Sequence, residues 1–359
     1  TWHDVEAFAP CTPGDWSGCD ASQLRWMTGV MLLTAAGAAV VARRVAALAS
    51  LRLFVFGVLA WGVAMAILQR YLDDSVLHDG NAMVWVLYAV AGGFALATLR
   101  EASMLSRAAL HGAWLATWTV VVMQLLDQGA EALALGEGWR VAAAVLPMTG
   151  LVALLGSRAR GFAAPLAAQF DEYRGVLRVT FAVPLAIAWC GSLFLAGAST
   201  PLPWVPLLNP LELTQALALT LLLAWSWQHR GEGGARPVLV ALVAFAWITF
   251  ATLRSTAVWF DLPYDAGMLD ATEAQTALTL VWSLLGVVGW VLGSRRGERG
   301  LWLAGALLMA VVLAKLLLVD RRDLGTLFGI VSFLAYGLLC TAVGYFAPAP
   351  PRRAAHTEA

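Results

Sequence analysis

The sequence predicts an all-α fold, a polytopic bundle of about eleven transmembrane helices. Its N-terminus is expected outside the cell and its C-terminus in the cytosol. Of the 359 residues, 60% are hydrophobic and only 13% are charged, whereas soluble domains carry about 25% charged residues. So little charge could not cover a water-facing surface, so lipid is the expected solvent.

Apolar stretches follow one another along almost the whole chain, each near the roughly 20 residues that a membrane-spanning helix needs. In lipid, only helices and closed barrels satisfy every backbone polar group. Barrel strands are excluded because they span a membrane with only about 9–11 alternating residues. The predicted spans are 24–42, 51–69, 81–99, 108–126, 139–157, 177–197, 210–228, 236–254, 272–293, 300–319 and 325–347.

The loops between these spans alternate in charge, which predicts their orientation. Sixteen basic and 6 acidic residues fall on the predicted cytosolic side, against 6 arginines and 17 acidic residues on the other. An excess of arginine and lysine in short loops marks the cytosolic side of a membrane. The loop 320–323 is balanced, so the last hairpin has to be oriented by its neighbours.

Outside the bundle, assigned to residues 23–347, the sequence predicts an extracytoplasmic segment over 1–22 and a disordered cytosolic tail over 348–359. Because the chain begins at Thr1 in a polar segment, we interpret it as the C-terminal part of a longer protein or as a processed product. In the connection 158–176, one helical face carries four apolar or aromatic residues and predicts an interfacial helix. They are Phe162, Leu166, Phe170 and Tyr173.

Two cysteines, Cys11 and Cys19, lie in the acidic outer segment, where oxidising conditions permit a disulfide. Two unpaired thiols are the alternative. The chain lacks cysteine and histidine spacings typical of zinc sites, and its loops lack basic, aromatic-rich stretches typical of nucleic-acid binding. No cofactor, metal or nucleic acid is therefore expected.

Lys315 is the single lysine and lies in the apolar run 307–319, about one turn from its outer end. A lysine at full bilayer depth costs on the order of 3 kcal/mol. Two interpretations stay open: a structural residue that snorkels or pairs with an acid, or a member of a working site. We expect its ammonium to face an acid or carbonyls of the seventh or ninth span, with Glu212 as the preferred partner.

Other polar residues lie at the predicted outer ends of the last five spans. Asn209, Pro210 and Glu212 form a capping-box pattern, with Gln215 one turn deeper on the same helical face. Arg254 ends the eighth span, and the ninth begins with Asp270 and Glu273, or Thr272 and Gln275, as alternative caps. Their common depth makes them candidate ligand-binding residues, and caps remain the alternative for most of them.

Tryptophans Trp204 and Trp259 lie in outer loops and are candidate platforms for a sugar. The alternative is that they belong to the aromatic belt that tryptophans form at membrane interfaces.

Several stretches of the C-terminal third resemble a known group of proteins. They are 204–213 (WVPLLNPLEL), 274–283 (AQTALTLVWS), 301–305 with 314–320 (LWLAG and AKLLLVD), and 331–337 (VSFLAYG). Together, over about residues 200–350, they resemble the predicted bacterial inner-membrane proteins grouped as domain of unknown function 2339. The resemblance implies a long multi-pass protein with recurrent Asn-Pro, Lys and Asp positions. Those positions fall on Asn209, Pro210, Lys315 and Asp320.

Three functions are compatible with these residues. The leading hypothesis is a non-enzymatic inner-membrane protein that binds or passes a lipid headgroup or glycan at an outer-leaflet polar cavity. The second is an integral-membrane transferase acting on a lipid-linked or acyl substrate, which needs a convergent base and nucleophile. The third is a structural scaffold. The expected partner is membrane lipid, with an envelope glycan or lipid-linked substrate as a further one, and the oligomeric state is not readable.

The charge bias yields a topological prediction. Single cysteines placed in the loop 295–299 should resist a membrane-impermeant thiol reagent in intact cells, because that loop is expected in the cytosol. Cysteines placed in the loop 127–137 should react. Labelling of the 295–299 loop would contradict the orientation.

Overall fold

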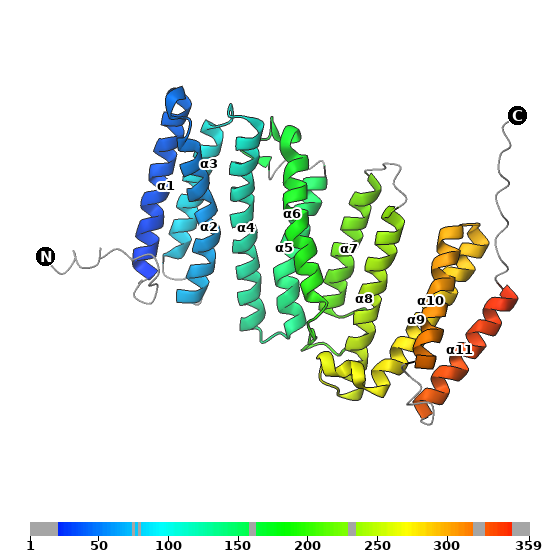
Figure 1. The fold of residues 1–359 in the computed structure, drawn as a ribbon. Helices are drawn as coiled ribbons and strands as arrows, with labels where there is room; N and C mark the ends of the chain where they lie inside the picture. The colour runs from blue at the N-terminus through cyan, green and yellow to red at the C-terminus, as the bar shows by residue number, and fades with distance from the viewer. Residues whose placement is uncertain are drawn as a thin grey trace, which may run out of the picture. The chain divides into compact units, whose positions relative to one another are not determined.

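The computed structural model describes residues 21–73, 76–77, 80–157, 163–228, 235–318 and 327–346. Over these residues it is all-α, with eleven α-helices and two short 3-10 helices (Figure 1). The α-helices are α1 (Ala21–Arg44), α2 (Leu51–Asp73), α3 (Asn81–Thr98), α4 (Met104–Ala132), α5 (Glu137–Gly156), α6 (Phe170–Ser192), α7 (Pro210–Gln228), α8 (Ala235–Phe260), α9 (Thr272–Arg296), α10 (Arg299–Leu318) and α11 (Leu327–Phe346). The 3-10 helices are η4 (Ala46–Leu48) and η6 (Ala266–Asp270).

Each predicted span is matched by one α-helix, which confirms the all-α fold. Within the described residues, nine helices are long and apolar enough to cross a membrane, and α7 offers a shorter apolar segment, Pro210–Ala224. The N-terminal segment with Cys11 and Cys19, and the tail after 346, lie outside the described residues.

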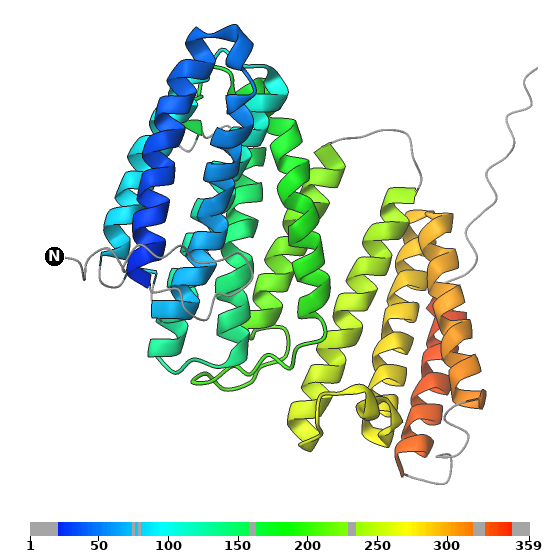
Figure 2. The ribbon, with the colours of Figure 1, turned by 60° about the vertical axis from the view of Figure 1, so that its left-hand side comes forward.

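The chain divides into two compact units (Figure 2). Unit 1 comprises Thr1–Ser192, Gly197–Leu202 and Leu213–Gly231. Unit 2 comprises Leu193–Ala196, Pro203–Glu212 and Glu232–Ala359. Unit 1 therefore contains α1 to α6 and most of α7, while unit 2 contains the first turn of α7 together with α8 to α11.

In unit 1, α4 packs against α2, α5 and α6, and α1 packs against α2 and α3. Aromatic side chains form a cluster on α3 and α4, in which Tyr88 stacks on Trp114 with ring centroids 5.1 Å apart. The Tyr88 hydroxyl and the Thr117 hydroxyl both donate to the carbonyl of Leu59, at 2.8 and 3.1 Å. These hydrogen bonds satisfy polar groups that would otherwise be buried without partners.

The interfacial helix predicted in the 158–176 connection is wrong in the part that the structure describes. Leu166, Phe170 and Tyr173 are buried, at 1%, 1% and 0% exposure. Phe170 and Tyr173 lie in the first turn of α6 and pack on His111 of α4, whose Nδ1 is 2.9 Å from the Tyr173 hydroxyl. Another helix of the same chain, α4, covers this apolar face, so the face does not lie on the membrane surface.

In unit 2, α9 is the central helix and packs against α8, α10 and α11. Glycines on the facing surfaces of α9 and α10 let the two backbones approach closely. A Cβ atom at Gly293 would overlap the backbone of Trp302, and one at Gly305 would overlap the backbone of Trp290. This hairpin is therefore a tightly packed support for the rest of the unit.

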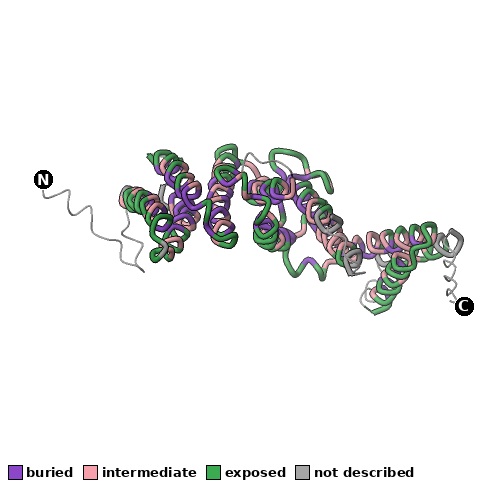
Figure 3. Tube along the Cα trace, turned by 90° about the horizontal axis from the view of Figure 1, so that it is seen from above, coloured by how far each residue is buried: buried purple, intermediate pink, exposed green. Residues whose placement is uncertain are grey.

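The outward faces of the helices carry large apolar side chains, as a lipid-facing surface requires. Figure 3 shows buried residues on the inner sides of the helices and exposed residues on the outer sides. Examples of highly exposed apolar side chains are Leu53, Met83, Val90, Ile187 and Leu303, at 62–78% exposure. A soluble protein rarely exposes so many large apolar side chains.

The glycine packing of the α9–α10 hairpin predicts a selective loss of stability. Gly293→Ala should lower the thermal unfolding temperature of the purified protein, because overpacking costs typically about 1–3 kcal/mol. Gly300→Ala is the matched control, because an added Cβ there meets nothing within 4 Å. Equal unfolding temperatures for the two variants would contradict the close approach.

Candidate functional site

The first turn of α7 is held by a side-chain cap. The Asn209 Oδ1 accepts a hydrogen bond from the backbone N–H of Glu212 at 2.9 Å, and Pro210 is the first helical residue. The missing N–H of proline is harmless at this position, because the first helical N–H has no intrahelical acceptor. The predicted cap by Asn209 is confirmed.

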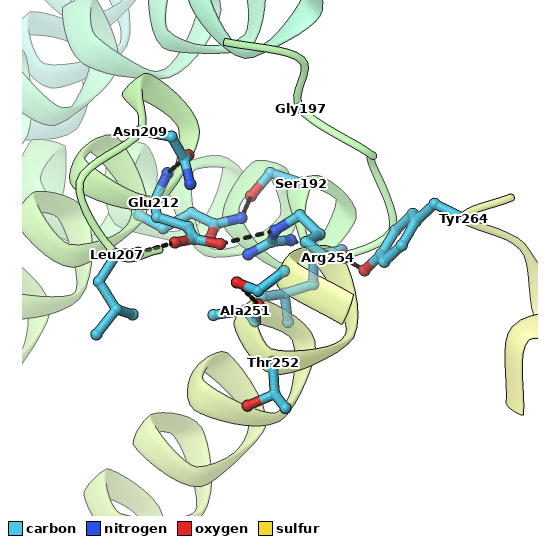
Figure 4. A network of polar contacts seen from close by, with 12 residues as sticks. Ser192, Gly197, Leu207, Asn209, Glu212, Ala251, Thr252, Arg254 and Tyr264 are labelled. Atoms are coloured by element: carbon cyan, nitrogen blue, oxygen red, sulfur yellow. Dashed lines mark hydrogen bonds and ion pairs between the residues drawn. The ribbon is translucent and has the colours of Figure 1, made fainter. Parts of the chain in front are cut away.

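The carboxylate of Glu212 extends beyond its capping role. Its Oε2 accepts from the backbone N–H of Leu207 at 2.5 Å, and its Oε1 lies 3.2 Å from Nε of Arg254 (Figure 4). Leu207 adopts a left-handed conformation, with φ of 64°, which is uncommon for a residue with a branched side chain. The Glu212 carboxylate therefore binds both the backbone of Leu207 and the side chain of Arg254.

Arg254 lies inside α8 rather than at its end, because α8 continues to Phe260. Both Arg254 and Glu212 have side chains that are 0% exposed. The Arg254 Nη1 donates to the carbonyl of Leu193 at 3.1 Å, and the Tyr264 hydroxyl donates to the same carbonyl at 2.8 Å. Figure 4 shows Glu212 and Tyr264 approaching Arg254 from opposite sides.

The Leu193 carbonyl and Tyr264 were not predicted from the sequence. The carbonyl is available because α6 ends at Ser192, and the last carbonyls of a helix lack intrahelical partners. The predicted span 177–197 ran past this point and concealed it. Burial raises the pKa of Tyr264, while the nearby Arg254 acts in the opposite direction, so the hydroxyl remains a donor at neutral pH.

Lys315 makes a second polar contact in unit 2. Its Nζ donates to the backbone carbonyl of Gln275 at 3.1 Å and lies 2.8 Å from the hydroxyl of Thr279. The expectation that it faces carbonyls of the ninth span is confirmed. The expected pairing with Glu212 is wrong, because that carboxylate is bound to Arg254 instead. Thr279 was missed, although it lies one helical turn beyond Gln275.

A small apolar cluster holds α8 and α9 at the level of both polar contacts. Its buried members are Leu253, Ala257, Met268, Ala274 and Leu278. Arg254 directly follows Leu253 in the sequence. The two α9 residues that contact Lys315, Gln275 and Thr279, directly follow Ala274 and Leu278. The apolar cluster therefore positions the backbone from which both polar contacts are made.

The remaining predicted residues are placed separately. Gln215 belongs to unit 1, where its amide donates to the hydroxyl of Ser192 at 2.8 Å. The Gln275 side chain donates to the carbonyl of Leu269. Neither predicted cap of α9 forms, because its N-cap is Ala271 without a side-chain bond. Asp320 lies outside the described residues.

The two outer-loop tryptophans differ in their surroundings. Trp259 is 65% exposed. Trp204 is half-buried, and its Nε1 is buried without an acceptor. The amide nitrogen of Asn209, which is 2% exposed, is in the same condition. The segment 203–212 thus contains two buried N–H donors that have no acceptor among the described residues.

Energetically, the Arg254–Glu212 pair is weak evidence for stability and stronger evidence for a site. Moving two charges out of water costs several kcal/mol each, and apolar residues of similar volume are often as stable or more stable. Ionisable residues inside membrane spans are by default functional-site hypotheses. The arrangement offers hydrogen-bond donors and one balanced charge pair. In the described part of the chain, no three His, Cys, Asp or Glu side chains cluster as a metal site would require.

The buried pair yields a prediction about stability. Glu212→Leu should lower the free energy of unfolding by about 3–5 kcal/mol, because it leaves a buried cation uncompensated. The double variant Glu212→Leu with Arg254→Met should recover most of that loss. Chemical denaturation in detergent measures both. Asp127→Asn is the control, because it removes the more exposed Asp127–Arg140 pair, and such pairs contribute about 0–1 kcal/mol. Equal losses in the single and double variants would contradict the pairing.

Comparison with known proteins identifies the chain at the level of its family. No curated protein and no solved structure matches it. A family model described as predicted membrane protein, DUF2339, matches residues 16–350. The similarity inferred for the C-terminal third therefore extends over nearly the whole chain, which belongs to the DUF2339 family of predicted membrane proteins.

Proposed function

We propose that this protein resides in the bacterial inner membrane and binds a lipid headgroup or glycan of the envelope without transforming it. The proposed site comprises Asn209, Glu212, Arg254 and Tyr264 in unit 2. The observation that carries the proposal is the Arg254–Glu212 pair, both side chains of which are 0% exposed. A purely structural bundle gains little from such a pair.

The chemistry of these groups favours binding. The carboxamide of Asn209 carries N–H groups that donate to the oxygens that headgroups and glycans present, and the Tyr264 hydroxyl oxygen, whose proton is donated to Leu193, accepts from ligand hydroxyl groups. A few polar groups set among apolar side chains are typical of small-molecule sites. The apolar cluster around Leu253 and Leu278 supplies the rigid support that such a site needs.

The charge bias of the loops favours the outer leaflet. Arg254 lies in the last third of α8, and Lys315 lies in the last turn of α10. Both helices are expected to end on the extracytoplasmic side, where 17 of the 23 acidic residues are predicted. A ligand would therefore be an outer-leaflet lipid or an envelope glycan, and Lys315 a second donor at that side.

The test measures bound lipid directly. The full chain is reconstituted in vesicles of bacterial inner-membrane lipid extract and purified from them. Its bound lipid is then measured by native mass spectrometry. The wild type should retain lipid, and the double variant Glu212→Leu with Arg254→Met, which is expected to keep the fold, should lose at least about tenfold in occupancy. Lys315→Met should also reduce occupancy while remaining folded.

Asp127→Asn is the matched control, because its carboxylate belongs to a more exposed ion pair in unit 1. It should retain lipid at the wild-type level. Equal occupancy in the wild type, the double variant and the control would overturn the proposal, because bound lipid would then depend only on the apolar surface. Release of a chemically altered lipid would favour the transferase alternative.

A further inference from the structure

The orientation of the Asn209 carboxamide is determined by its role as a cap. Its oxygen has to accept from the backbone N–H of Glu212, at 2.9 Å, because the amide nitrogen cannot accept. The nitrogen is therefore the group without a partner. Exchanging the two amide atoms would leave the first turn of α7 uncapped, so a flip does not resolve the unsatisfied donor.

Trp204 supplies a second donor of the same kind. An indole has one N–H and accepts nothing, and the Nε1 of Trp204 is buried without an acceptor. Only five positions separate Trp204 from Asn209 in the loop that leads into α7. Burying a donor without an acceptor costs about 1–3 kcal/mol, so the short segment 203–212 carries two such penalties.

The charge state of the neighbourhood selects between ligands. The guanidinium of Arg254 already faces the carboxylate of Glu212, so the pair is neutral. An additional phosphate would bring an uncompensated negative charge into a buried environment, which is unfavourable. Two uncharged N–H donors instead match uncharged acceptor oxygens, and the indole of Trp204 combines one of these donors with an apolar ring face.

We propose that the ligand of this site is a glycosyl headgroup, whose hydroxyl or ring oxygens accept from Asn209 Nδ2 and Trp204 Nε1. This inference rests on the proposed function and narrows its ligand to an uncharged sugar. Both nitrogens are shielded from water, so the loop 203–209 has to open for the sugar to enter. Leu207, at φ of 64° and bound by Glu212, lies within that loop.

The test removes each donor and keeps everything else. Asn209→Ser retains a capping oxygen of nearly equal quality and loses the amide N–H groups, and Trp204→Phe retains an aromatic ring without its N–H. The full chain is reconstituted in phosphatidylcholine vesicles containing either monoglucosyl diacylglycerol or phosphatidylglycerol, and bound lipid is quantified by native mass spectrometry.

The expected result is preferential binding of the glucosyl lipid by the wild type. Each variant should lose about fivefold in affinity, equivalent to one hydrogen bond of ~1 kcal/mol. Its unfolding temperature without ligand should be equal or higher, because an unsatisfied donor is gone. Trp302→Phe is the matched control. The Trp302 Nε1 is likewise buried without an acceptor among the described residues, but Trp302 lies in the first turn of α10, at the end opposite to Lys315. Glucosyl-lipid binding should therefore not change in this variant.

Other outcomes separate this inference from the proposed function. Glucosyl-lipid binding that Asn209→Ser and Trp204→Phe leave unchanged would overturn the inference. So would preferential binding of phosphatidylglycerol, although the proposed function would survive if that binding were lost in the double Arg254 and Glu212 variant. Failure to bind any of the lipids would overturn both.

Discussion

The central constraint on unit 2 is that a guanidinium buried at 0% exposure has to be surrounded by acceptors. The geometry of several chain segments follows from it. The chain has to leave the helical conformation at Leu193 to present a carbonyl. The helix α7 has to begin at Pro210, so that Glu212 lies in its first turn. The apolar cluster around Leu253 packs α8 against α9 and so fixes the position of Arg254 relative to α9.

Arg254 and Lys315, two cations inside the described part of unit 2, are accommodated differently, and the difference follows from their chemistry. Arg254 is a planar, rigid donor that suits simultaneous contact with a carboxylate and a carbonyl. Lys315 has a flexible side chain with a compact charge, and its ammonium contacts a backbone carbonyl and a hydroxyl on α9. Because Lys315 is partly exposed, its charge needs less compensation, so the Arg254 pair bears most of the desolvation penalty.

Local signals in the sequence were sufficient to predict that the helices exist and that Asn209 caps α7, because both depend on residues that are close together in the sequence. Contacts between helices were harder to predict. Lys315 was the cation expected to face Glu212, and hydropathy does not show that Arg254 faces it instead. Phe170 and Tyr173 were misassigned for a related reason: an apolar helical face looks the same whether lipid headgroups or another helix covers it. Thr279 was recoverable from helical spacing, whereas the Leu193 carbonyl required the end of α6 to be known.

The distribution of strain within unit 2 argues for a binding loop on a rigid support. The α9–α10 hairpin is packed so closely that a Cβ at Gly293 or Gly305 would overlap the neighbouring backbone. The segment 203–209 differs in its backbone: it combines a left-handed Leu207 with two side-chain donors that have no acceptor among the described residues. Such costs persist only where surrounding structure imposes them, and they concentrate at functional sites. Here the Glu212 carboxylate imposes the Leu207 conformation, so the ion pair that neutralises Arg254 also keeps the loop closed. A ligand that satisfies the donors would offset the cost of opening it.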